Sequence, residues 1–325
     1  MATRRSEYDV TDRINTTDSA AVDEAVRRIF LDLYPGASAA LLSHAFRDCT
    51  QLYGGKHPAY RACDTAYHNL QHVLDVSLAM ARLMDGYERS AERSEPIGPT
   101  LFGFGVITAL FHDIGYLRRR TDTRHRNGAE YTLRHVSRGA GFLEQYMKEA
   151  GLGHLAGEAA RVIHFTGYEI AVDRIEVANP TFRLLGNMLG SADILAQMSD
   201  RCYLEKCRDR LYPEFVAGGL ARGEGNEPAP KTAVFSSVRH LICNTPAFYR
   251  SAKLRLTEHL GAACRYLGRH FDGDDLYEAE VVKNIRYAER VAERGDLSML
   301  RRVPPAVAPL EHASSLSGQT ADALA

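Results

Sequence analysis

The sequence has few cysteines, no long apolar run and almost no net charge, and each of these absences excludes a class of protein. Its six cysteines are scattered and never form a C-x-x-C pair, so neither a thiolate zinc site nor a disulfide framework is indicated. The longest apolar stretch, residues 101–111, is too short to span a bilayer. A formal net charge of -1 gives no support to an extended nucleic-acid or membrane surface.

The first residues are polar and lack the apolar segment of a secretory signal. Together with the unpaired cysteines, this pattern indicates a reducing compartment. We therefore expect a cytoplasmic protein with no membrane partner, and the sequence leaves its oligomeric state open.

Period-two alternation of apolar residues is also nearly absent, whereas apolar residues recur three and four positions apart along most of the chain. This spacing predicts an all-α protein, and 325 residues with 45% hydrophobic content suffice for one large core. We expect a single helical domain over residues 19–302, between flexible polar tails at 1–18 and 303–325. Two segments rich in Gly, Pro and charge, around 85–100 and 217–232, are expected to be exposed loops.

Two histidines lie four positions apart in the run YHNLQHVLDV, residues 67–76. Positions four apart lie on one face of a helix, so His68 and His72 can point toward the same small volume. Asp75 either accepts the second ring N–H of His72 or is an exposed helix acid. Tyr67 and Asn69 either orient the site or serve packing and capping.

Three further residues complete a candidate ligand set. His112 and Asp113 are adjacent in ALFHDIGY, and Asp193 is a carboxylate within the otherwise small and apolar run GSADILAQM. A buried carboxylate needs a partner, and a metal ion is the strongest partner. Two imidazoles and two carboxylates are a mixed nitrogen and oxygen donor set that suits zinc, iron or manganese. The sequence therefore predicts a metal site that includes His72.

These motifs resemble a known superfamily. His72, the pair His112-Asp113 and Asp193 are similar to the H…HD…D signature of the HD-domain metal-dependent phosphohydrolases. The run YHNLQHVLDV resembles the Y-H-N-x-x-H-x-x-D-V signature of class I cyclic-nucleotide phosphodiesterases, and the likeness covers roughly residues 60–215.

The resemblance implies a compact phosphodiesterase-like helical bundle that hydrolyses a phosphoester, either a phosphodiester or a nucleotide. It implies catalysis by metal-activated hydroxide, with Asp113 bridging two ions. It also assigns to His68 the role of the general acid that protonates the leaving oxygen.

Two more histidines are candidate ligands of a second ion. The run EYTLRHVSRGAGFL resembles the E…H-x-x-x-G segment of the HD-GYP branch, which would make His135 a ligand, and His164 lies in an apolar run just before Gly167. The alternative for each is an ordinary core histidine. With both, the site would hold two divalent ions (zinc, manganese, magnesium or iron). Arg138 is either a phosphate contact at this site or part of a solvated helix face.

The sequence departs from the phosphodiesterase pattern at positions that matter for the substrate. Tyr116 stands where H-D-x-x-H-P-G has its second histidine, the Pro-Gly is absent, and the purine-binding glutamine has no clear match. The expected substrate is therefore a small phosphoester or nucleotide, and these departures leave specificity for cyclic nucleotides open. Two alternatives stay open: an HD-domain di-iron oxygenase, which resembles this chain in using four histidines and two aspartates, and a non-catalytic metal-binding sensor module.

Overall fold

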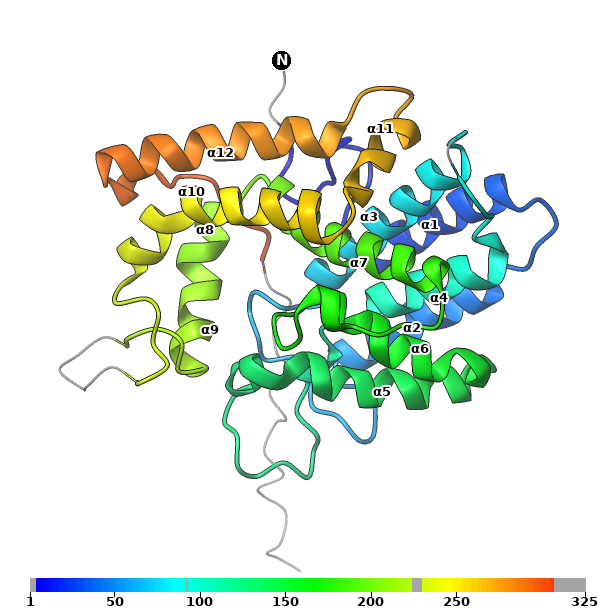
Figure 1. Cartoon of the computed structure of the whole chain (residues 1–325). Helices are drawn as coiled ribbons and strands as arrows, with labels where there is room; N and C mark the ends of the chain where they lie inside the picture. Colours follow the sequence, from blue (N-terminus) through cyan, green and yellow to red (C-terminus); the bar gives the residue numbers. More distant parts are fainter. Residues whose placement is uncertain (1–3, 92, 224–229, 307–325) are drawn as a thin grey trace, which may run out of the picture.

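Helices joined by turns and irregular segments make up the described part of the chain. The computed structural model describes residues 4–91, 93–223 and 230–306, and in these ranges the chain forms no β-strand, so the all-α prediction is confirmed. The helices are α1 (Ser19–Leu33), α2 (Ala40–Tyr53), α3 (Leu70–Glu88), α4 (Gly98–Leu110), α5 (His135–Glu149), α6 (Ala156–Val162), α7 (Pro180–Ser199), α8 (Tyr203–Lys206), α9 (Tyr212–Ala217), α10 (Val238–Leu254), α11 (Tyr266–His270) and α12 (Leu276–Arg294) (Figure 1).

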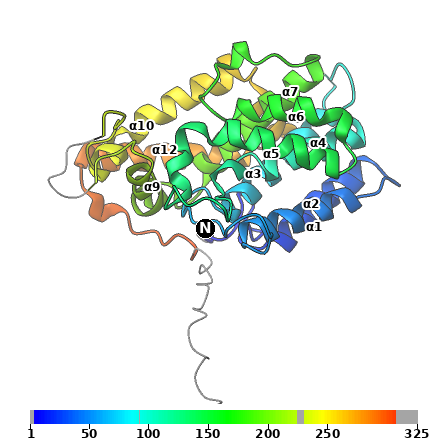
Figure 2. The same cartoon turned by 90° about the horizontal axis from the view of Figure 1, so that it is seen from below.

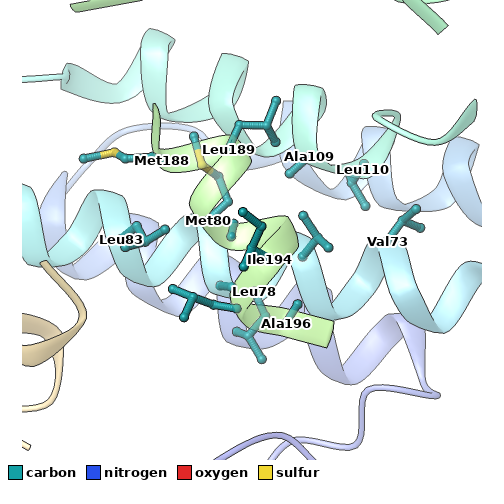
Figure 3. Close-up of a cluster of buried hydrophobic side chains, with 14 of the residues drawn as sticks. Val73, Leu78, Met80, Leu83, Ala109, Leu110, Met188, Leu189, Ile194 and Ala196 are labelled. Carbon is teal, nitrogen blue, oxygen red and sulfur yellow. The ribbon is translucent and has the colours of Figure 1, made fainter. Parts of the chain in front are cut away.

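Helix α3 is buried on nearly every side. Its apolar residues surround the helix axis, which is typical of a helix inside a large core. It packs against α1, α4, α7 and α11. Figure 3 shows part of this core, to which α3, α4 and α7 contribute Val73, Leu78, Met80, Leu83, Ala109, Leu110, Met188, Leu189, Ile194 and Ala196.

The remaining helices extend the molecule on two sides of this core. Helices α10 and α12 pack against each other, and α12 also contacts α7. Figures 1 and 2 place α9, α10 and α12 toward one end and α1, α2 and α4 toward the other. Helix α8 continues through a π-helical turn, Cys207–Leu211, into α9. None of the helices in the described ranges combines the length and the apolar character that a bilayer crossing needs.

Residues 4–18, expected to be a flexible tail, instead contact the helical body. The side chain of Asp9 is buried and pairs with the buried guanidinium of Arg82 on α3. Arg82 also donates to the hydroxyl of Tyr277 on α12, at 3.0 Å. This buried network attaches the N-terminal segment to two helices, which the polar composition of the segment did not reveal.

The other segments expected to be irregular also differ from the prediction in part. Helix α3 extends to Glu88, whose buried carboxylate accepts hydrogen bonds from the N–H groups of Ile97 and Gly98 at 2.8 and 3.0 Å, so the expected loop at 85–100 is partly helical and tightly held. At the C-terminal end, Arg210 donates to the carbonyl of Pro305. The rest of the expected tail, 307–325, lies outside the described residues.

We predict that Asp9→Ala lowers the free energy of unfolding by about 3–5 kcal/mol, because it leaves Arg82 as an uncompensated buried charge. Urea unfolding followed by circular dichroism measures the change. The matched control is Glu24→Ala, which breaks the Arg28–Glu24 pair, whose side chains are 70% and 65% exposed. An exposed pair contributes at most about 1 kcal/mol. A loss in Asp9→Ala no larger than in this control would contradict the structural role of the buried pair.

Candidate metal centre

Four of the predicted ligands meet in space although they come from three different helices or their ends. His72 lies in the first turn of α3, His112 and Asp113 follow the end of α4, and Asp193 lies within α7. The Nε2 atoms of His72 and His112 are 3.3 Å apart, and each is 3.3 Å from Oδ2 of Asp113. Oδ1 of Asp193 lies 3.3 Å from Nε2 of His72 and 3.8 Å from Nε2 of His112. Buried His72, His112 and Asp113 form a candidate metal-binding group.

The spacing and chemistry of these atoms fit a divalent cation. Four ligand atoms placed tetrahedrally around zinc at its usual bond length are roughly 3.3 Å apart. Oδ2 of Asp113 is buried and has no hydrogen-bond partner among the described residues, an arrangement that is costly unless a cation balances it. Nδ1 of His112 donates to the carbonyl of Ala109 at 2.7 Å. In the neutral ring this leaves the lone pair of Nε2 free to bind a metal.

Protons compete with a metal for the same atoms. Burial disfavours the charged form of His72, but the carboxylates of Asp113 and Asp193 outweigh it and raise the pKa of His72 to about 10. Burial alone would raise the pKa of Asp113. The neighbouring His112 and His72 outweigh this effect, so the pKa of this carboxyl lies well below its usual value. Metal binding at such a group releases protons, so it should strengthen as the pH rises.

His135 faces the other oxygen of the central carboxylate. Its Nε2 is 3.5 Å from Oδ1 of Asp113, and its Nδ1 donates to the carbonyl of Thr132 at 2.7 Å. Helix α5 approaches the 3-10 helix η1 (Ile114–Tyr116) closely because residue 115 is glycine: a Cβ there would lie 1.8 Å from the carbonyl oxygen of His135. Each carboxylate oxygen of Asp113 therefore has at least one histidine ring nitrogen nearby.

His164 is not brought into this group. It lies in the 3-10 helix Ile163–Phe165, and it neither lines the cavity described below nor belongs to the candidate metal-binding group. Burial lowers its pKa against the opposing charge of Glu169. Its role as a metal ligand stays a prediction from sequence alone.

His68 lies beside the ligand group but outside the helix. Helix α3 begins at Leu70, with Asn69 as its N-cap, so the prediction that His68 and His72 share a helix face is wrong. Nδ1 of His68 is 2.6 Å from Oε2 of Glu214 on α9, whose side chain is only 5% exposed. Because a carboxylate accepts, Nδ1 donates, and Nε2 is left to exchange a proton within the cavity that the ring lines.

Glu214 was missed by the sequence analysis. It is separated from His68 by 146 residues and also accepts a hydrogen bond from the backbone N–H of Tyr67. The signal that was available is a lone acid in the run LYPEF, within the stretch that resembles the phosphodiesterases.

Tyr116 is stacked between two histidines of the site. Its ring centroid is 4.4 Å from that of His68, with 14° between the planes, and 4.4 Å from that of His135, with 21° between the planes. The side chain is buried. The residue that departs from the phosphodiesterase pattern therefore holds the ring planes of both the candidate acid and a candidate ligand.

Tyr67 is part of the site, whereas Asn69 stabilises a helix end. Tyr67 lines the cavity, and its hydroxyl donates to the side-chain oxygen of Gln197 at 3.4 Å. Asn69 caps α3 by accepting from the N–H of His72 at 3.2 Å, so it fixes the start of the helix that carries this ligand.

Asp75 and Arg138 have structural partners. Asp75 accepts a hydrogen bond from Thr16, and burial raises its pKa to about 7. It is therefore not an exposed helix acid, which was one of the two roles expected for it. The guanidinium of Arg138 lies 3.2 Å from the ring centroid of Tyr131 and donates to the carbonyl of Gly115. Arg138 does not line the cavity, so its contact with a phosphate stays a prediction from sequence alone.

The site opens into a cavity of about 680 Å³. His68, His72, Asp113, His135 and Asp193 all line it. Its other walls are mainly apolar and aromatic, from Ile194, Tyr203, Leu211, Phe215, Leu220, Val234, Phe235, Leu241 and Phe248. A cavity of this size accommodates a small organic molecule next to the ligand group.

Comparisons of the chain with models of protein families, with curated proteins and with solved structures find no match. The HD-domain resemblance therefore stays a prediction that rests on the motifs.

We predict that millimolar manganese raises the thermal unfolding midpoint of the protein, and that Asp113→Asn abolishes this shift. A ligand at about 100 times its Kd adds roughly 2.7 kcal/mol of stability, which corresponds to about 4 °C for a domain of this size. The shift should be larger at pH 8 than at pH 6 because the protons that compete with the metal are released more easily at the higher pH.

The matched control is Asp173→Asn, a change at an exposed aspartate outside the site, which should keep the full shift. An equal manganese effect in Asp113→Asn and in Asp173→Asn would place the metal elsewhere.

Proposed function

We propose that the protein is a metal-dependent hydrolase of small phosphoesters, with phosphodiesters as its most direct substrates. The observation that carries this proposal is that the candidate metal group and the His68–Glu214 pair line the same cavity. One part of the site suits a phosphoryl group, and the other suits the oxygen that must leave it.

The ligand group would hold the ions. His72, His112, Asp113 and Asp193 supply the first set of donor atoms, and the second oxygen of Asp113 with His135 supplies part of another. Divalent ions, when bound, lower the pKa of water and neutralise charge on phosphoryl oxygens. The proposal includes two ions per chain, which would be zinc, manganese, magnesium or iron.

His68 would supply the proton that an alkoxide leaving group needs. In the hydrolysis, the attacking water loses a proton to solvent and its oxygen bonds to phosphorus. The ester P–O bond breaks, the leaving oxygen takes a proton from Nε2 of His68, and solvent then returns a proton to His68. Glu214 fixes the orientation of the ring by its contact with Nδ1. An oxygenase or a sensor has no need for such a donor, which is why hydrolysis is the function favoured by this pair.

The first test compares two diesters whose leaving groups differ in how much they need a proton from a general acid. Diphenyl phosphate releases phenolate, a stronger base than the 4-nitrophenolate released from bis(4-nitrophenyl) phosphate. We predict that His68→Ala lowers the turnover of diphenyl phosphate by about 10²–10⁴-fold and that of the nitrophenyl ester far less. Glu214→Gln should show the same selective loss to a smaller degree. Both variants should keep their metal, measured by elemental analysis.

The matched control is His44→Ala, at an exposed histidine outside the cavity, which should retain full activity toward both esters. Loss of metal in His68→Ala would overturn its assignment as the acid. Two irons per chain with no hydrolysis under manganese, magnesium or zinc would favour the oxygenase instead.

We further predict that the Tyr116 stack contributes to turnover through ring orientation. Tyr116→Leu removes the aromatic face and should lower kcat by about 3–10-fold with little change in KM, the range expected for loss of one aromatic stacking contact. Tyr116→Phe keeps the ring and should retain most of kcat. Equal losses of kcat in both variants would assign the effect to the hydroxyl rather than to the stack.

A further inference from the structure

Apart from its histidines, the described lining of the cavity carries no basic side chain. No lysine or arginine in the described ranges lines it, and the residues outside those ranges contain neither type. The side chains of fixed charge in its lining are Asp113, Glu169 and Asp193, all of them acidic. A ligand with several negative charges would therefore lose water without gaining a cation of the protein for each charge, which is costly.

One arginine that contacts residues of the lining is held by other partners. Arg255 donates to the carbonyls of Phe165 and Gly167 at 2.8 and 2.7 Å, and its guanidinium lies 4.2 Å from the ring centroid of Tyr168. Tyr168 lines the cavity, whereas Arg255 does not. Phosphate recognition usually relies on arginine or lysine. Without them, the cavity can balance the charge of one phosphoryl group at the ligand group but not further negative charges elsewhere on a ligand.

Flat apolar surfaces make up much of the remaining wall. The rings of Phe215 and Phe235 lie 5.7 Å apart with 3° between their planes, and those of Tyr203 and Phe248 lie 6.3 Å apart with 24° between their planes. These four residues come from α8, α9, α10 and the segment that precedes α10. Such aromatic pairs offer extended faces to an apolar group.

Large apolar side chains are also exposed where they line this cavity. Leu133, Tyr168 and Val234 are 61%, 76% and 64% exposed, and all three belong to the lining. Apolar side chains gathered in the open at one place indicate contact with an apolar partner or ligand. A substrate with an apolar portion would cover them, whereas a fully polar substrate would not.

We propose that the substrate is a phosphodiester with one negative charge and one large apolar or aromatic ester group. The phosphoryl group lies at the ligand group, and the apolar group lies along the aromatic wall. This inference rests on the proposed hydrolase function and narrows its substrate class.

The test is a homologous series of methyl, butyl and octyl 4-nitrophenyl phosphates, assayed with manganese by release of 4-nitrophenolate. Each methylene that enters the apolar wall should raise kcat/KM by up to about fourfold, so the octyl ester should exceed the methyl ester by at least about 30-fold. The 7-carboxyheptyl ester has the same reach with a second negative charge, and it should lose most of this gain.

Two wall variants separate apolar contact from charge. Phe248→Ala should flatten the rise along the series, because it removes one aromatic face. Asn244→Arg adds a cation at an exposed position of the lining, and it should recover much of the lost activity toward the 7-carboxyheptyl ester. The matched control, Leu254→Ala, lies on the same helix outside the cavity and should leave the series unchanged.

The outcomes distinguish this inference from the function on which it rests. If the methyl ester is hydrolysed but kcat/KM is flat along the series, or if the 7-carboxyheptyl ester equals the octyl ester, the substrate class is wrong and the hydrolase function stands. If no ester is hydrolysed with any of the metals, the hydrolase function itself fails.

Discussion

The carboxylate of Asp113 is buried between histidines, and the surrounding structure has to balance its charge. One of its oxygens has no hydrogen-bond partner among the described residues and lies 3.3 Å from the Nε2 atoms of both His72 and His112. The other faces His135. A buried charge of this kind is tolerated only with a compensating positive charge. The first turn of α3, the end of α4 and the start of α5 therefore have to meet at one point, and Gly115 permits the closest of these approaches.

The position of His68 depends on a second set of contacts. His68 is held in its plane by Tyr116 on one face and by the carboxylate of Glu214 at its Nδ1. Glu214 comes from α9, and the aromatic wall of the cavity comes largely from α8, α9 and α10. The helices that orient His68 thus also shape the apolar pocket, so in the proposed hydrolase proton donation and substrate fit would depend on the same elements.

Local sequence patterns were enough to predict the fold class and part of the candidate metal site. Helical periodicity predicted the all-α fold, and the motifs placed His72, His112 and Asp113 together, because each lies in a short run with its own chemical signature. The partner of His68 could not be predicted, since Glu214 is distant in sequence and becomes its neighbour only when α9 packs. For the same reason, polar composition suggested a loose N-terminal tail where Asp9 in fact forms a buried ion pair.

The most direct measurement of the central claim is an anomalous difference map from crystals grown with manganese. We expect a peak next to Nε2 of His72 and His112 and to carboxylate oxygens of Asp113 and Asp193, within bonding distance of each. A peak at another histidine and acid pair, such as His125 with Asp122, together with none at Asp113, would contradict it.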